Sequence, residues 1–163
     1  MENLHDKIAQ HGQHSSDKKN STGDEKPINI LMVEDSYGDT LLMLTALNAA
    51  NINYNLDRID NGDEVLPYLE KAAQEKLPDV IFLDMELPGT DGFEILDILS
   101  AAPTPIKSIP VAIMTIQSNF NYLQKNYDLS ICGHLTKPVN TASVQTILSS
   151  IPSLGGAQKT APR

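Results

Sequence analysis

Short apolar runs alternate along this chain with longer segments in which apolar residues recur every three or four positions. The short runs are rich in β-branched residues, which is typical of strands buried on both faces. The second run instead alternates apolar and polar residues, which indicates a more exposed strand. We therefore expect five strands, at Ile28–Glu34, Tyr54–Asp60, Asp79–Asp84, Ile109–Thr115 and Ile131–Leu135.

The longer segments have the apolar spacing of helices that cover one face of a sheet. The predicted helices are Tyr37–Asn51, Asp63–Lys76, a segment through Phe93 and Leu99, Asn119–Tyr127 and Thr141–Ile151. Five strand–helix units in about 125 residues predict a doubly wound α/β domain with a parallel sheet and helices on both faces. Right-handed crossovers leave few arrangements, and a flavodoxin-like one fits this size best.

Both ends of the chain lack this pattern. Residues Met1–Pro27 are polar without a sustained apolar period, and we expect a disordered tail there. Residues Ser153–Arg163 are rich in Gly, Ala, Thr and Pro and predict a flexible tail. The folded domain is therefore expected to span residues 28–152.

Charge and hydropathy exclude two classes of partner. The formal net charge is −9 and the pI is about 4.7, without the basic stripe of a protein that binds nucleic acid directly. The same charge disfavours attachment to anionic lipid. No apolar run has the length of a membrane span, and the N-terminus lacks the apolar region of a signal peptide. We expect a cytoplasmic location.

Acidic residues follow two of the predicted strands directly. Glu34 and Asp35 end the first apolar run, and Asp84 ends the third. Ligands of an open parallel sheet bind outside the carboxyl ends of its strands. Neighbouring carboxylates repel one another, so three of them together call for a cation, and Mg²⁺ prefers a few carboxylate oxygens with water. The sequence predicts a Mg²⁺ site at this edge.

A hydroxyl and an ammonium are expected at the same edge. Thr115 ends the fourth strand, and Lys137 follows the fifth. Both groups can donate hydrogen bonds to a phosphoryl oxygen. An aspartate can also act as a nucleophile toward phosphorus, which makes Asp84 a candidate for covalent phosphorylation.

These residues together resemble the receiver domain of bacterial two-component response regulators, the CheY-like family. The resemblance covers about Ile28–Ile151, and it includes the loop Leu87–Gly92 and the pair Lys137-Pro138. It implies the strand order 2-1-3-4-5. By the same resemblance this is a stand-alone signalling protein rather than an enzyme, acting on itself only through its own phosphorylation and dephosphorylation.

The resemblance also assigns roles to residues. Asp84 would accept a phosphoryl group from a sensor histidine kinase or a histidine phosphotransfer protein. Asp35 and Asp84 would bind Mg²⁺ directly, Glu34 through water, and Glu86 through its backbone carbonyl. Thr115 and Lys137 would contact the phosphoryl group, and the Lys137–Pro138 peptide bond is expected to be cis.

Three positions depart from the family pattern. His134 stands where an aromatic Tyr or Phe is usual, and it is either a switch side chain that moves with Thr115 or an exposed residue at a strand end. Ile116 replaces a small residue, and it either narrows access to the phosphoryl group or is a packing choice. Glu86 adds an acidic side chain that either assists Mg²⁺ binding or hydrolysis, or is merely solvated.

The first helix is apolar over most of its circumference. With Leu42, Met43 and Leu47 placed toward the sheet, Leu41 and Leu44 fall on the outer side and are predicted to dock on a histidine-bearing partner. The output is expected to pass through contacts with an unidentified downstream protein, and a homodimer is compatible with the family.

Two other functions remain open at this stage. One is a receiver-fold adaptor that works without phosphorylation, which the departures at His134 and Ile116 allow. The other is a Mg²⁺-dependent phosphatase with an aspartyl nucleophile. Such enzymes carry the nucleophile on the first strand with a second acid two residues later, whereas Asp35 is followed by Ser36 and Tyr37.

Overall fold

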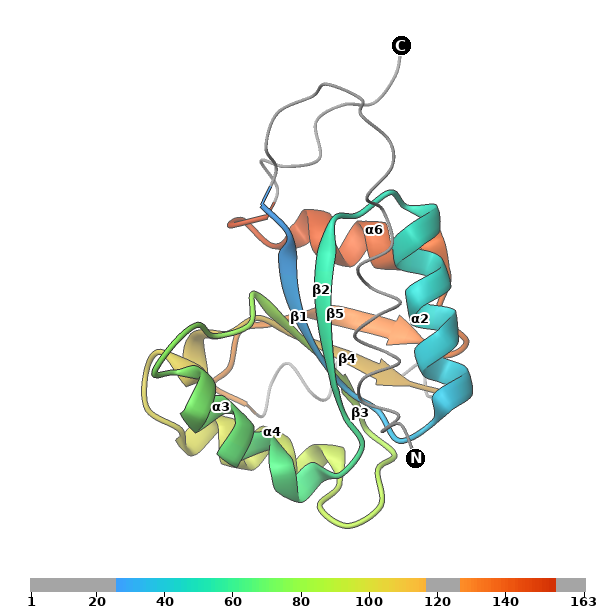
Figure 1. The fold of residues 1–163 in the computed structure, drawn as a ribbon. Helices are drawn as coiled ribbons and strands as arrows, with labels where there is room; N and C mark the ends of the chain where they lie inside the picture. Colours follow the sequence, from blue (N-terminus) through green and yellow to red (C-terminus); the bar gives the residue numbers. More distant parts are fainter. Residues whose placement is uncertain (1–25, 117–126, 155–163) are drawn as a thin grey trace, which may run out of the picture.

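Five parallel strands form one sheet in the order β2-β1-β3-β4-β5 in a computed structural model of the protein (Figure 1). The structure describes residues 26–116 and 127–154. The predicted fold class and strand order are confirmed. The strands are β1 Ile28–Val33, β2 Tyr54–Ile59, β3 Val80–Asp84, β4 Val111–Thr115 and β5 Ile131–Thr136.

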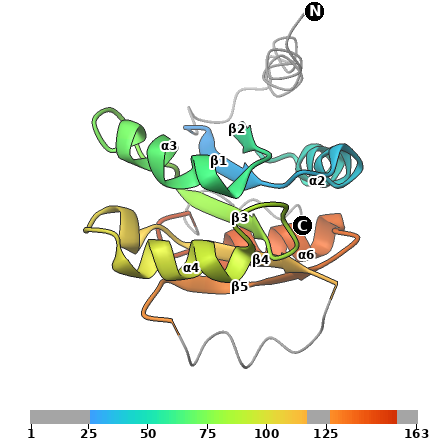
Figure 2. The ribbon, with the colours of Figure 1, turned by 90° about the horizontal axis from the view of Figure 1, so that it is seen from below.

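Helices cover both faces of the sheet. Figures 1 and 2 show α2 and α6 on one face and α3 and α4 on the other. Two short 3-10 turns, η1 and η2, precede α3 and β4. None of the described helices is long and apolar enough to cross a membrane. The bounds are α2 Tyr37–Ala49, η1 Gly62–Glu64, α3 Val65–Ala72, α4 Gly92–Ala101, η2 Ile106–Ser108 and α6 Thr141–Ser150.

Each face of the sheet has its own apolar core. Phe82 of β3 packs in the core under α2 and α6, whereas its neighbours Ile81 and Leu83 pack in the core under α3 and α4. Because successive side chains of a strand point to opposite faces, a strand between two helical layers must be apolar at every position. All five residues of β3 are buried, which accounts for the continuous apolar run in the sequence.

Several predicted boundaries are wrong. The helix predicted to continue to Lys76 ends at Ala72, and its start is a 3-10 turn. The chain stays packed beyond residue 152, because Leu154 is buried in the core under α2 and α6. Other parts of the prediction lie outside the described residues. They are residues 1–25 and 155–163 of the two tails and residues 119–126 of the predicted helix Asn119–Tyr127.

The outer face of α2 differs from the prediction. Leu44 is buried, with 7% of its surface exposed, whereas Leu42 is 41% exposed. The buried stripe contains Thr40, whose hydroxyl donates to the Ser36 carbonyl at 2.9 Å and so can enter the core. A helix that is apolar nearly all round does not reveal from its sequence which side is buried. The docking prediction therefore fails for Leu44 and stands for Leu41, which is 45% exposed.

A bulge in β5 sets the orientation of the residues that follow it. Val111 pairs with Ile131, but Ala112 pairs with Gly133, so Cys132 is an extra residue on β5. Gly133 has a φ of +152°, and a Cβ there would lie 2.5 Å from Ile147 Cδ1. Only glycine fits this close approach between β5 and α6.

Candidate functional site

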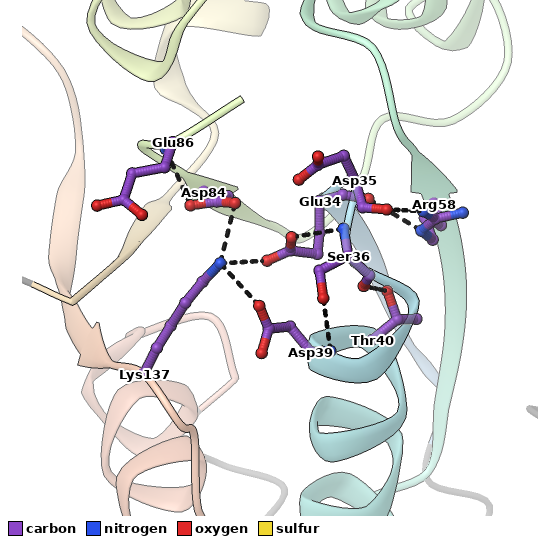
Figure 3. A network of polar contacts seen from close by, with 9 residues as sticks. All are labelled: Glu34, Asp35, Ser36, Asp39, Thr40, Arg58, Asp84, Glu86 and Lys137. Atoms are coloured by element: carbon purple, nitrogen blue, oxygen red, sulfur yellow. Dashed lines mark hydrogen bonds and ion pairs between the residues drawn. The ribbon is translucent and has the colours of Figure 1, made fainter. Parts of the chain in front are cut away.

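The carboxylates predicted from the sequence do meet at the carboxyl edge of the sheet. Glu34 and Asp35 follow β1, and Asp84 ends the neighbouring strand β3 (Figure 3). One carboxylate oxygen from each lies within 4.8 Å of the others. Glu34 and Asp84 are buried, whereas Asp35 is exposed. The site is therefore a buried acidic floor that opens to solvent at Asp35.

Lys137 reaches into this cluster from the end of β5. Its ammonium lies 2.7 Å from Glu34 Oε2, 2.9 Å from Asp84 Oδ2 and 3.1 Å from Asp39 Oδ2 (Figure 3). The lysine side chain is only 11% exposed. The Lys137–Pro138 peptide bond is cis, as predicted. The Lys137 ammonium thus links three carboxylates that come from three different segments of the chain.

Burial and charge shift the ionisation of this pair. Desolvation raises the pKa of Glu34 to about 7 and the Asp84 charge adds to the rise, although hydrogen bonds from Lys137 and from the Ser36 amide oppose it. Desolvation alone would lower the pKa of Lys137, but hydrogen bonds to Glu34, Asp84 and Asp39 together raise it. Lys137 therefore stays charged, while ionised Glu34 is costly in the metal-free protein.

Other groups fix the acidic side chains and their backbone in place. The Glu86 amide donates to Asp84 Oδ1 at 3.0 Å, so both oxygens of Asp84 have partners. The Ser36 amide donates to Glu34 Oε1 at 2.9 Å. From β2, the Arg58 guanidinium donates to the main-chain carbonyls of Glu34 (2.9 Å) and Asp35 (2.8 Å). Its side chain is 7% exposed, so the guanidinium itself is largely shielded from water.

The residues of the cluster fit a divalent cation. Glu34 Oε2 is buried, and its close partner is the Lys137 ammonium. Buried carboxylate oxygens of this kind, beside two further carboxylates, are the ligands that hard cations such as Mg²⁺ and Mn²⁺ prefer. We conclude that Glu34, Asp35 and Asp84 are suited to hold such an ion.

Thr115 and His134 lie on the neighbouring strands. Thr115 is buried at the end of β4, and its carbonyl accepts from the Lys137 amide at 3.0 Å. His134 is half-buried and pairs with Ile113, whose side chain lies in the core under α3 and α4. By strand alternation Thr115 faces the same side as Ile113. The arrangement thus places Thr115 and His134 on one face of the sheet.

The two remaining departures are at the surface. Ile116 is 62% exposed, so it is not a packing choice, and its effect on access to the site stays a prediction. Glu86 is also exposed, and its backbone amide rather than its side chain contacts Asp84.

Asp39 and Arg58 are parts of the site that we did not predict. Asp39 lies in the first turn of α2, where the Ser36 side chain caps the helix by accepting from the Asp39 amide at 3.2 Å. A helix that follows a strand after a connection of only three residues keeps its first turn at that edge, and this was the available signal. Arg58 gave no comparable signal beyond its place at the end of β2.

Comparison with known proteins agrees with this geometry. The model of the response regulator receiver domain family matches residues 30–149, and the chain therefore belongs to that family. The response regulator Rcp1 of a Synechocystis species is 30% identical over 127 residues, which cover 76% of this chain and 86% of Rcp1.

Solved structures of receiver proteins are similar as well. The bacteriophytochrome response regulator RtBRR has a TM-score of 0.68 at 29% identity, covering 78% of this chain and 79% of its own. The Mn²⁺-bound form of Rcp1 has a TM-score of 0.61 at 29% identity, covering 84% of this chain and all of its own. The phosphorylated cyanobacterial phytochrome response regulator RcpA has a TM-score of 0.62 at 29% identity, with 85% and 100% covered.

Proposed function

We propose that this receiver domain accepts a phosphoryl group on Asp84 and passes a signal through protein contacts. The observation that carries the proposal is the state of the Asp84 carboxylate. It is 1% exposed, and a backbone amide and the Lys137 ammonium hold its two oxygens at 3.0 and 2.9 Å. A nucleophile held in one orientation beside a cation suits transfer of an anionic group.

The transfer forms one bond and breaks one. A carboxylate oxygen of Asp84 attacks phosphorus, and the bond from phosphorus to the donor's leaving atom breaks with its electron pair going to that atom. With a phosphohistidine donor the leaving atom is a ring nitrogen, and a proton on the other ring nitrogen of the donor lets the histidine leave as neutral imidazole. Lys137 and the Thr115 hydroxyl donate to the phosphoryl oxygens and hold the product. Asp35, Asp84 and the Glu86 carbonyl, with Glu34 acting through water, would hold a divalent cation, which would neutralise part of the phosphoryl charge.

The phosphoryl group then shifts the population between two conformations. Engagement of the Thr115 hydroxyl would favour one position of the neighbouring His134 side chain and so alter the surface around β5. We propose that this surface contacts a downstream protein or a second copy of the chain. The protein on this proposal is a cytoplasmic signalling component rather than an enzyme acting on other substrates.

The phosphodonor is proposed to be a sensor histidine kinase or a histidine phosphotransfer protein that docks on α2. Leu41 is 45% exposed and lies on the same helix as Asp39, close to the site. The variant Leu41→Asp is expected to slow transfer from such a partner while leaving modification by a small phosphodonor unchanged. An equal loss with both donors would contradict docking through Leu41.

Mass measurement tests the proposed function directly. The protein is incubated with Mg²⁺ and either acetyl phosphate or a phosphorylated histidine kinase, and the intact mass is recorded. We expect one phosphoryl adduct that is absent in Asp84→Asn. No adduct from any donor would favour a phosphorylation-independent adaptor, and turnover of a free phosphate ester would favour a phosphatase.

A further inference from the structure

The Lys137 ammonium is shared among three carboxylates. It has three N–H donors, and Glu34, Asp84 and Asp39 oxygens lie at 2.7, 2.9 and 3.1 Å. With the side chain 11% exposed, little of the ammonium is left for water or for another anion. A phosphoryl oxygen that binds Lys137 must therefore replace one of these contacts.

The three contacts differ in how easily they are given up. The Glu34 side chain is fully buried, so water cannot take the place of the lysine there. The Asp84 side chain is 2% exposed, and it is the group to which the phosphoryl group becomes bonded. The Asp39 side chain is 32% exposed, so water can take the place of the lysine. Asp39 is the contact that costs least to break.

We propose that Asp39 is a positioning residue that competes with the phosphoryl group for the Lys137 ammonium. The inference rests on the proposed function of Asp84. Before phosphorylation Asp39 holds the lysine, and afterwards it releases the lysine to a phosphoryl oxygen and is hydrated. Asp39 thereby weakens binding of the phosphoryl group and shortens its lifetime on Asp84.

The test compares amide variants at two equivalent helix positions. Asp39→Asn keeps the shape and an acceptor oxygen but removes the charge. Glu94→Gln is the matched control, since Asp39 and Glu94 each stand three residues after a capping side chain, Ser36 in α2 and Asp91 in α4. Both changes remove one negative charge from the first turn of a helix. Asp39→Glu restores the charge and should restore wild-type behaviour.

Two quantities are measured in the presence of Mg²⁺. One is the affinity for beryllium trifluoride, a mimic of the phosphoryl group, and the other is the rate of phosphoryl loss after labelling by acetyl phosphate. For Asp39→Asn we expect about two- to fivefold tighter binding and a similarly slower loss, the effect of a partly exposed ion pair. Glu94→Gln should change neither quantity.

The outcomes separate this inference from the proposed function. Unchanged or weaker binding in Asp39→Asn, or the same gain in Glu94→Gln, overturns the competition by Asp39 while the wild-type protein still takes up the phosphoryl group. A wild-type protein that binds neither beryllium trifluoride nor a phosphoryl group overturns the function of Asp84 and this inference with it.

Discussion

Removing the buried charge of Glu34 should stabilise the metal-free protein. The carboxyl group is fully buried and its pKa rises from 4.5 to about 7, with desolvation as the largest cause. Because the folded-state pKa is the higher one, the folded protein holds this proton more tightly than the unfolded chain. The free energy of unfolding therefore falls as pH rises from about 4.5 to 7 and is level above that range.

The pKa shift sets the size of the effect. At 1.36 kcal/mol per pKa unit, the ionised carboxylate costs about 3 kcal/mol at pH 8 and about 1 kcal/mol at pH 5.5. Glu34→Gln mimics the protonated form and keeps an oxygen for the Ser36 amide. The variant should thus exceed wild type in stability by about these amounts.

Urea unfolding followed by far-UV circular dichroism measures the difference, since the chain has no tryptophan for a fluorescence assay. The experiment is run in EDTA at both pH values, with Glu86→Gln as a control that removes an exposed carboxylate at the same edge. Added Mg²⁺ should stabilise wild type far more than Glu34→Gln. If Glu34→Gln were less stable than wild type at pH 8 in EDTA, the reasoning about the buried charge would be refuted.

Three further tests of the scaffold use the same unfolding measurement. Arg58→Met should lower the free energy of unfolding by about 2–4 kcal/mol, because the main-chain carbonyls of Glu34 and Asp35 lose a charged donor. Full stability in Arg58→Lys would contradict a need for both N–H groups of the guanidinium. Gly133→Ala should cost about 1–3 kcal/mol through its positive φ and the contact with Ile147, and a neutral effect would argue against the bulge as described. Leu44→Ala should cost about 2–5 kcal/mol and Leu41→Ala less than about 0.5 kcal/mol, since only Leu44 is buried. Equally small costs for both variants would instead match the orientation expected from sequence, with both leucines on the outer side.

The sequence was sufficient for the fold and for most of the acidic cluster. Continuous apolar runs such as β3 indicate strands covered on both faces, and parallel connections bring every strand's carboxyl end to one edge. Residues placed at those ends, Glu34, Asp35, Asp84 and Thr115, must then lie near one another whatever the details of packing.

Only the tertiary structure decided which side of α2 is buried and which face of the sheet carries His134. The first depends on the rotation of the helix, and the second on a one-residue shift in β5. The apolar sequence of α2 fits more than one orientation, and packing buried Leu44 instead of Leu42. The extra residue Cys132 in β5 moves His134 to the face of Thr115, and without this bulge strand alternation would put it on the other face.

The partners of Lys137 were likewise beyond the sequence. Its position at the end of β5 predicted a contact with a phosphoryl group on Asp84. In the structure the ammonium contacts Asp84, Glu34 and, from the first turn of α2, Asp39. Strand order brings such groups to the same edge, while the angle of each helix and the rotamer of each long side chain decide which of them touch. The sequence alone therefore determined what chemistry is gathered at the edge of the sheet, and the three-dimensional packing determined how one lysine is divided among three carboxylates.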